Sequence, residues 1–147
     1  MERWVFAGFL MTAAVQDWNK KQVEVWVYQL FGGLALMTGL CRILAGTEPG
    51  WMEMAGSFCI GLCMLGAGMV SCGGIGSGDG CFFLVSSLLL RFRENLMLLC
   101  YGTVLCGIYC LGYLVWCRWH SEGYAGKRIV PFLPFLVPPG IWLLVCG

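Results

Sequence analysis

Two aspartates are the residues of this 147-residue chain whose type and position could do chemistry. Asp79 ends the stretch Gly76-Ser77-Gly78-Asp79, and Asp17 lies at the end of the first apolar segment. An ionisable group at a membrane boundary is costly to move inward, so an aspartate in such a place is a candidate functional residue. The glycines around Asp79, including Gly80, allow a tight backbone turn and the close approach of another chain.

Two carboxyl groups that approach each other have an obvious use. Like charges a few ångströms apart cannot both ionise cheaply, so such a pair holds one proton between its members. The ionised member can take a proton from water while the protonated member polarises a peptide carbonyl. This is the chemistry of an aspartic protease, and it needs neither a metal nor a cofactor.

The ten cysteines do not predict a metal site or a disulfide framework. They lie in or beside apolar segments, and the sequence contains no CxxC pair. Cys59/Cys63 and Cys106/Cys110 are each spaced by one helical turn, as expected of small packing residues. The one histidine, His120, has no second histidine with which to form a zinc site. We therefore expect no metal and no cofactor.

Composition indicates an integral membrane protein. The chain is 59% hydrophobic and only 12% charged, whereas a soluble domain carries about 25% charged residues. The formal net charge of +1 gives no electrostatic reason to expect a nucleic-acid partner. Apolar segments cover nearly the whole length, so we expect membrane lipids around a single membrane-embedded domain, residues 1–147.

The apolar segments predict an all-α, polytopic membrane helix bundle of about six transmembrane helices. They cover residues 1–17, 23–43, 51–70, 79–90, 96–116 and 130–146. Segments 23–43 and 51–70 are each long enough for a full crossing, which takes about 20 residues. Because two crossings return the chain to the face it left, Asp17 and Asp79 should share a membrane face.

Loop charges favour the cytoplasm for the face that Asp17 and Asp79 share, because cytoplasmic loops carry an excess of Lys and Arg. The difference is small. Five basic residues belong to the face of the aspartates and four to the other: Lys20, Lys21, Arg118, Lys127 and Arg128 against Arg3, Arg42, Arg91 and Arg93.

Three segments resemble the type 4 prepilin peptidases, the membrane aspartic proteases of the GxGD class. Residues 17–23, Asp-Trp-Asn-Lys-Lys-Gln-Val, resemble that family's first catalytic aspartate at a helix end followed by a basic stretch. Residues 76–79 match the GxGD motif. Residues 127–136 resemble the proline- and phenylalanine-rich segment that opens the family's last helix. The order and spacing of these segments extend the resemblance over essentially the whole chain.

The resemblance implies an endopeptidase that removes the short basic leader from prepilin or pseudopilin precursors, where the leader meets an apolar helix. It implies an Asp17/Asp79 catalytic dyad at the cytoplasmic face of the plasma membrane. An extended leader junction would cross the glycine loop, an acid could meet its basic residues, and a proline break could leave room near the dyad. The residues expected to contact substrate in these ways are Gly76, Gly78, Gly80, Glu24, Pro131 and Pro134.

Several features leave alternatives open. Glu24 could also be a solvated interfacial acid, and the prolines could simply terminate a helix. The chain has Val23-Glu24-Val25 where the family often has Ile-Pro-Asn, and Cys81 where it often has lysine. A catalytically degenerate scaffold or a small transporter of the same ancestry is therefore the rival function. A transporter should place ionisable groups at mid-span depth, whereas here the charges lie at predicted helix ends. No paired CxxC segment is present, so we expect peptidase activity without N-methylation.

Overall fold

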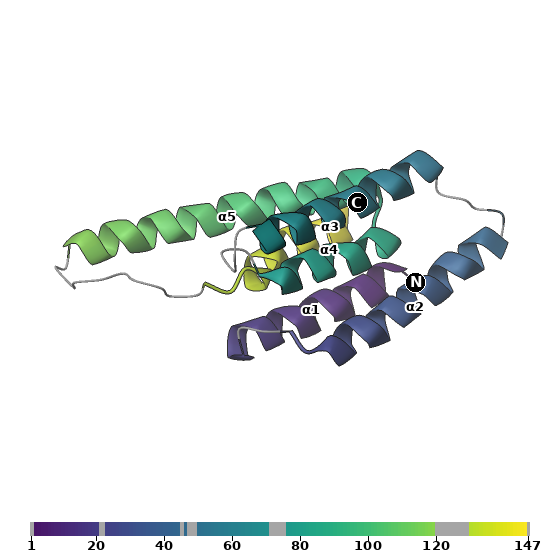
Figure 1. Ribbon diagram of the computed structural model, residues 1–147, viewed down its shortest axis with the longest axis horizontal. Helices are drawn as coiled ribbons and strands as arrows, with labels where there is room; N and C mark the ends of the chain where they lie inside the picture. Colours follow the sequence, from purple (N-terminus) through teal and green to yellow (C-terminus); the bar gives the residue numbers. More distant parts are fainter. Residues whose placement is uncertain are drawn as a thin grey trace.

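A computed structural model describes residues 2–20, 23–44, 46, 50–70, 76–119 and 130–146, and within these ranges the chain contains helices and no strands (Figure 1). The α-helices in this part of the chain are α1 (Glu2–Lys20), α2 (Val25–Leu44), α3 (Trp51–Val70), α4 (Ser77–Leu89), α5 (Phe92–Trp119) and α6 (Val137–Cys146). A short 3-10 helix, η1 (Leu133–Leu136), leads directly into α6. The all-helical prediction is confirmed for these residues.

Several helix boundaries differ from the sequence prediction. Helix α1 continues past Asp17 to Lys20, a good helix former on an exposed end of the helix. Helix α5 begins at Phe92, since the Glu94 side chain accepts the Arg91 N–H at 3.1 Å and caps the first turn. The last apolar segment is divided, with Pro134 in η1 before α6 begins.

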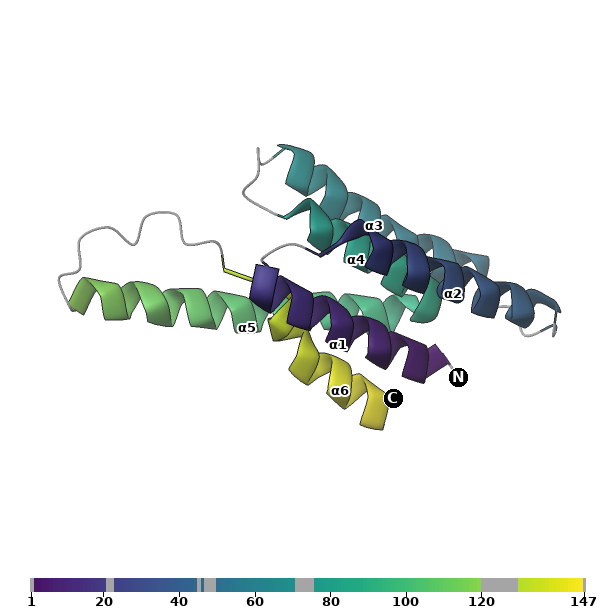
Figure 2. The same cartoon turned by 90° about the horizontal axis from the view of Figure 1, so that it is seen from below.

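Successive helices run in opposite directions along one axis. The carboxyl-terminal ends of α1 and α3 therefore lie at the same end of the bundle as the amino-terminal ends of α2 and α4 (Figures 1 and 2). The carboxyl-terminal half of α5 extends past the other helices at this same end (Figures 1 and 2). Asp17 near the end of α1 and Asp79 at the start of α4 therefore belong to one end of the bundle.

Aromatic rings from three helices form the centre of the core. Phe9 of α1 stacks on Phe82 of α4 with ring centroids 4.8 Å apart, and Phe31 of α2 lies 5.3 Å from Phe9. Phe9 and Phe82 are fully buried. Because each ring brings a large apolar area out of contact with the surroundings, this cluster fixes α4 against α1 and α2.

Helices α3 and α4 approach each other through glycines. A Cβ placed on Gly80 would lie 2.8 Å from the backbone nitrogen of Leu65, and one on Gly61 would lie 2.8 Å from that of Leu84. Both distances are shorter than real Cβ contacts, so only glycine permits this backbone approach. Small residues at close helix crossings are typical of helix packing in membranes.

A buried polar cluster joins the same pair to α5. Asn95 of α5 donates to the Ser57 hydroxyl of α3 at 3.0 Å, and the Ser86 hydroxyl of α4 donates to Asn95 Oδ1 at 2.8 Å. All three side chains are fully buried. Since each buried polar atom has a partner, the cluster holds α3, α4 and α5 in register without an unsatisfied group.

Among the described residues, two helical segments are long and apolar enough to cross a membrane: Met52–Val70 and Phe92–Trp119. Only 17% of the apolar window in the first and 11% in the second is buried within the protein. The helices are thus apolar on surfaces that face outward, which fits a membrane protein. Three further apolar helices are shorter: Val25–Cys41, Gly78–Leu89 and Leu133–Val145.

Candidate active site

Asp17 is held by the carboxyl-terminal segment. Its side chain is 7% exposed, and its Oδ2 accepts the backbone N–H of Leu133 at 3.0 Å. The backbone of Phe132 also interacts with this carboxylate. Leu133 is the first residue of η1, and the first N–H groups of a helix have no partner within it. Asp17 therefore supplies the missing acceptor, and the contact joins residues 116 positions apart in the sequence.

Asp79 is held by its own helix turn. It lies in the first turn of α4, whose N-cap residue is Gly76, and its N–H donates to the Gly76 carbonyl at 3.0 Å. A Cβ on Gly76 would lie 3.3 Å from Asp79 Oδ2, so the carboxyl group folds back over the start of its helix. A larger residue at position 76 would crowd this carboxyl group.

Tyr28 of α2 is a third member of the site that sequence reasoning missed. Its hydroxyl donates to the Gly78 carbonyl at 2.9 Å, immediately before Asp79. It is close enough to both aspartates to interact with them electrostatically. A signal was present, because Tyr28 is the one tyrosine of the apolar segment 23–43 and a buried tyrosine hydroxyl needs a partner.

The two aspartates come together at one end of the bundle. Helices α1 and α4 are in direct contact, and the charge of Asp17 acts on Asp79. The arrangement therefore places both carboxyl groups at one end of the bundle, within electrostatic range of each other and of the Tyr28 hydroxyl.

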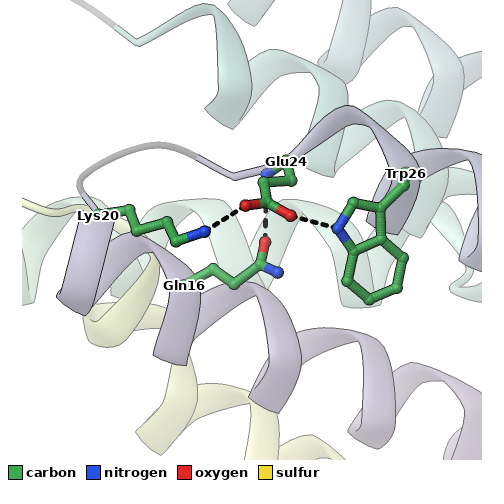
Figure 3. A network of polar contacts seen from close by, with 4 residues as sticks. All are labelled: Gln16, Lys20, Glu24 and Trp26. Atoms are coloured by element: carbon green, nitrogen blue, oxygen red, sulfur yellow. Dashed lines mark hydrogen bonds and ion pairs between the residues drawn. The ribbon is translucent and has the colours of Figure 1, made fainter.

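Glu24 lies between α1 and α2 and is engaged by the chain itself (Figure 3). Its carboxylate forms an ion pair with Lys20 and accepts a hydrogen bond from the Trp26 indole N–H. Its backbone N–H donates to Gln16 Oε1 at 3.1 Å. The Lys20 ammonium and the indole N–H hold the pKa of Glu24 below its ordinary value. Both carboxylate oxygens thus have partners that join α1 to α2, one turn beyond Asp17.

The two prolines lie on either side of the residues that hold Asp17. Pro131 is half-buried just before η1, and Pro134 is the second residue of η1, next to Leu133. Pro134 also lines an apolar groove along one face of α1. The groove is lined by Met11, Ala14, Val15, Trp18, Asn19, Pro134 and Val137. This face of α1 adjoins the position of Asp17.

The other expected site residue, Gly80, is buried against Leu65 of α3 and faces the helix interface. Among the described glycines, only Gly46 has a positive φ, at 69°. Gly76, Gly78 and Gly80 therefore do not depend on the left-handed region that favours glycine. Each instead makes room for a neighbour, respectively the Asp79 carboxyl group, the Tyr28 hydroxyl and the Leu65 backbone.

Within the part of the chain that the structure describes, no three His, Cys, Asp or Glu residues are placed to hold a metal ion. His120 and residues 127–129 lie outside the described residues. The cysteines whose side chains are described are free thiols: Cys41, Cys59, Cys63, Cys81, Cys100, Cys106, Cys110 and Cys117.

The family model of the type IV leader peptidases matches residues 4–111, a range that contains Asp17, Tyr28 and Asp79. Neither the curated proteins nor the solved structures contain a significant match to the chain. The family match covers well over half of the 147 residues. The chain belongs to the type IV leader peptidase family, whose members are membrane-associated proteases.

Proposed function

We propose that the protein is an aspartic endopeptidase that removes the basic leader from type IV prepilin or pseudopilin precursors, with Asp17 and Asp79 as its catalytic dyad. The proposal is supported by the position of these two acids at one end of the bundle, on the contacting helices α1 and α4, where the charge of Asp17 acts on Asp79. Membership of the leader peptidase family supplies the reaction class, hydrolysis of a peptide bond.

The chemistry follows from two carboxyl groups that share one proton. The ionised carboxylate accepts a proton from water as the water oxygen attacks the carbonyl carbon of the scissile peptide bond. The protonated carboxyl group donates a hydrogen bond to the carbonyl oxygen, where negative charge develops. The tetrahedral intermediate then collapses and the C–N bond breaks. The leaving nitrogen takes up the proton that the carboxylate accepted from water.

The surroundings of the dyad suggest where a substrate would lie. Gly76 and Gly78 present little side-chain bulk next to Asp79, so an extended leader junction can approach there. Pro131 and Pro134 flank the segment that holds Asp17, and the groove at Pro134 is apolar like the substrate helix. Glu24 can contact a basic leader only in competition with Lys20.

The bundle is proposed to be a single multi-pass domain of the plasma membrane, with the dyad at the cytoplasmic side. The outward-facing apolar surfaces of α3 and α5 support the membrane location. An excess of one basic residue on the face of the aspartates supports the orientation.

Co-expression with a candidate prepilin tests the function. Wild-type protein should convert the precursor to the shorter mature form, whereas Asp17→Ala and Asp79→Ala should leave it uncleaved. Glu53→Ala is a matched control, because Glu53 is an exposed acid at the start of α3. Cleavage by either aspartate variant would refute the dyad. An uncleaved precursor in all samples, across several prepilins, would favour a degenerate scaffold.

A further inference from the structure

Tyr28 joins α2 to the start of α4 at the residue that precedes Asp79. Tyr28 is the fourth residue of α2, and its side chain is half-buried. The hydroxyl hydrogen can be donated once, and it goes to the Gly78 carbonyl at 2.9 Å. A hydrogen bond from a side chain of one helix to the backbone of another fixes their relative position, because the backbone atom cannot rotate away.

Because Gly78 has no side chain, it leaves room for the Tyr28 hydroxyl. A Cβ on Gly78 would lie 3.3 Å from the Tyr28 hydroxyl oxygen, the nearest described atom from outside its own helix. The distance is tighter than most real Cβ contacts, so a methyl group there would push the hydroxyl away. The absence of a side chain at position 78 thus serves the Tyr28 hydrogen bond and not an unusual backbone conformation.

Tyr28 is also placed to respond to the dyad. It interacts electrostatically with Asp79 and with Asp17. The described hydrogen bond that ties Tyr28 to the backbone beside Asp79 is the one to the Gly78 carbonyl, so this bond is the route by which Tyr28 can position Asp79.

We infer that Tyr28 is a positioning residue, which holds the Asp79 carboxyl group at its working distance from Asp17 by fixing the Gly78 carbonyl. The inference rests on the proposed peptidase function. Gly78 and Tyr28 form one unit in this arrangement, and changing either should have the same consequence for catalysis.

Purified protein in detergent and a prepilin peptide test the inference. Tyr28→Phe removes only the hydroxyl, and kcat should fall about tenfold, the effect of one hydrogen bond lost from the reacting arrangement. KM should stay within about twofold, because the hydroxyl does not touch the substrate. Tyr101→Phe is the matched control, since Tyr101 is exposed on α5, and its kcat should equal that of wild type.

A double-mutant cycle supplies the decisive readout. Gly78→Ala should lower kcat in the wild-type background. In the Tyr28→Phe background it should have little further effect, because the Tyr28 hydroxyl is the nearest described atom that the new methyl group would meet from another helix. Additive losses in the double variant would overturn the inference, as would a Tyr28→Phe enzyme that keeps the wild-type kcat.

The outcomes separate the two proposals. If wild-type protein cleaves no prepilin, the peptidase function fails and the positioning role fails with it. If wild-type protein cleaves and Tyr28→Phe raises KM as much as it lowers kcat, Tyr28 contributes to substrate binding and only the inference fails. Thermal unfolding of each variant shows whether a loss of activity merely reflects unfolding.

Discussion

Asp17 and Asp79 are chemically identical and lie at the same end of the bundle, yet they are held in different ways. Asp17 is buried and accepts a backbone hydrogen bond from Leu133, on a segment far away in the sequence. Asp79 is half-buried and lies over the first turn of its own helix, which Tyr28 fixes from the side. One carboxyl group depends on tertiary packing and the other on local geometry.

The difference teaches that the positions of the two aspartates can be disrupted separately. A change in the carboxyl-terminal segment should displace Asp17 and leave Asp79 in place. A change at the start of α4 should do the reverse. The site is therefore assembled by bringing together two independently supported groups.

The largest expected effect is the loss of cleavage in Asp17→Asn and Asp79→Asn. Each substitution keeps the size of the side chain and removes a proton-transfer group, so kcat should fall by about 10²–10⁴-fold or to background. An Asn at position 17 can still accept the Leu133 N–H, so its fold should be unchanged. Prepilin cleavage measured beside Glu53→Gln checks this. Equal activity in either variant would remove that aspartate from the mechanism.

The next largest effect is expected for Gly80→Ala. Its methyl group would lie under 3.0 Å from the Leu65 backbone, so α3 and α4 must separate. The free energy of unfolding should fall by about 1–3 kcal/mol, as for overpacking in other cores. Gly76→Ala is the comparison, since its methyl group meets only the Asp79 carboxyl group, and it should reduce kcat with little change in stability. If thermal unfolding and kcat changed in the same way in both variants, the two glycines would not have the separate roles inferred here.

A smaller effect is expected on stability, where Asp17→Ala should lower the free energy of unfolding more than Asp79→Ala does. Removing the Asp17 carboxyl group leaves the buried Leu133 N–H without its acceptor, which should lower the free energy of unfolding by about 1–2 kcal/mol. Removing the Asp79 carboxyl group leaves no described donor without a partner, so the change should be within about 0.5 kcal/mol. Asp17→Asn should restore the lost stability. Thermal unfolding that ranks the two alanine variants equally would contradict the comparison.

The smallest effect is expected for Glu24→Gln, which weakens the link between α1 and α2. The pKa of Glu24 is lowered from its ordinary value of 4.5, chiefly by Lys20, so its ion pair stabilises the fold above that pH. The stabilisation is lost as the pH falls through the lowered pKa. The Tm difference between wild type and Glu24→Gln should therefore be present at pH 7 and disappear in strong acid. It should also shrink in high salt, because the pair is exposed. If the Tm difference were the same at every pH and salt concentration, the charge of Glu24 would make no contribution to stability.

The helices and the shared end of the two aspartates could be predicted from the sequence. Apolar segments of sufficient length set the helices, and counting two crossings between Asp17 and Asp79 placed them together. The first turn of α5 was missed, because the Glu94 side chain caps it at Arg91 and a single acid among arginines is a weak signal.

The contacts that position the dyad could not be predicted. The Leu133 N–H and the Tyr28 hydroxyl reach the site through packing, and no spacing in the sequence relates either of them to an aspartate. The glycines were expected to allow a tight turn and the close approach of another chain. Among the described residues, Gly76, Gly78 and Gly80 make room for neighbouring atoms of the folded chain itself, and the sequence does not reveal which atoms these are.

The length of α5 has a consequence for where the reaction occurs. Its 28 residues extend about 42 Å at 1.5 Å per residue, more than the roughly 30 Å of hydrocarbon in a bilayer. The overhang carries outward-facing Leu114 and Val115 and ends near Arg118 and Trp119, residue types that settle among lipid headgroups. With that tip at the headgroups, the end of the bundle that holds Asp17 and Asp79 would lie deeper than the tip of α5 (Figures 1 and 2). In the proposed reaction, water would then have to pass below the level of the headgroups to reach the aspartates, while a helical substrate could approach from within the bilayer.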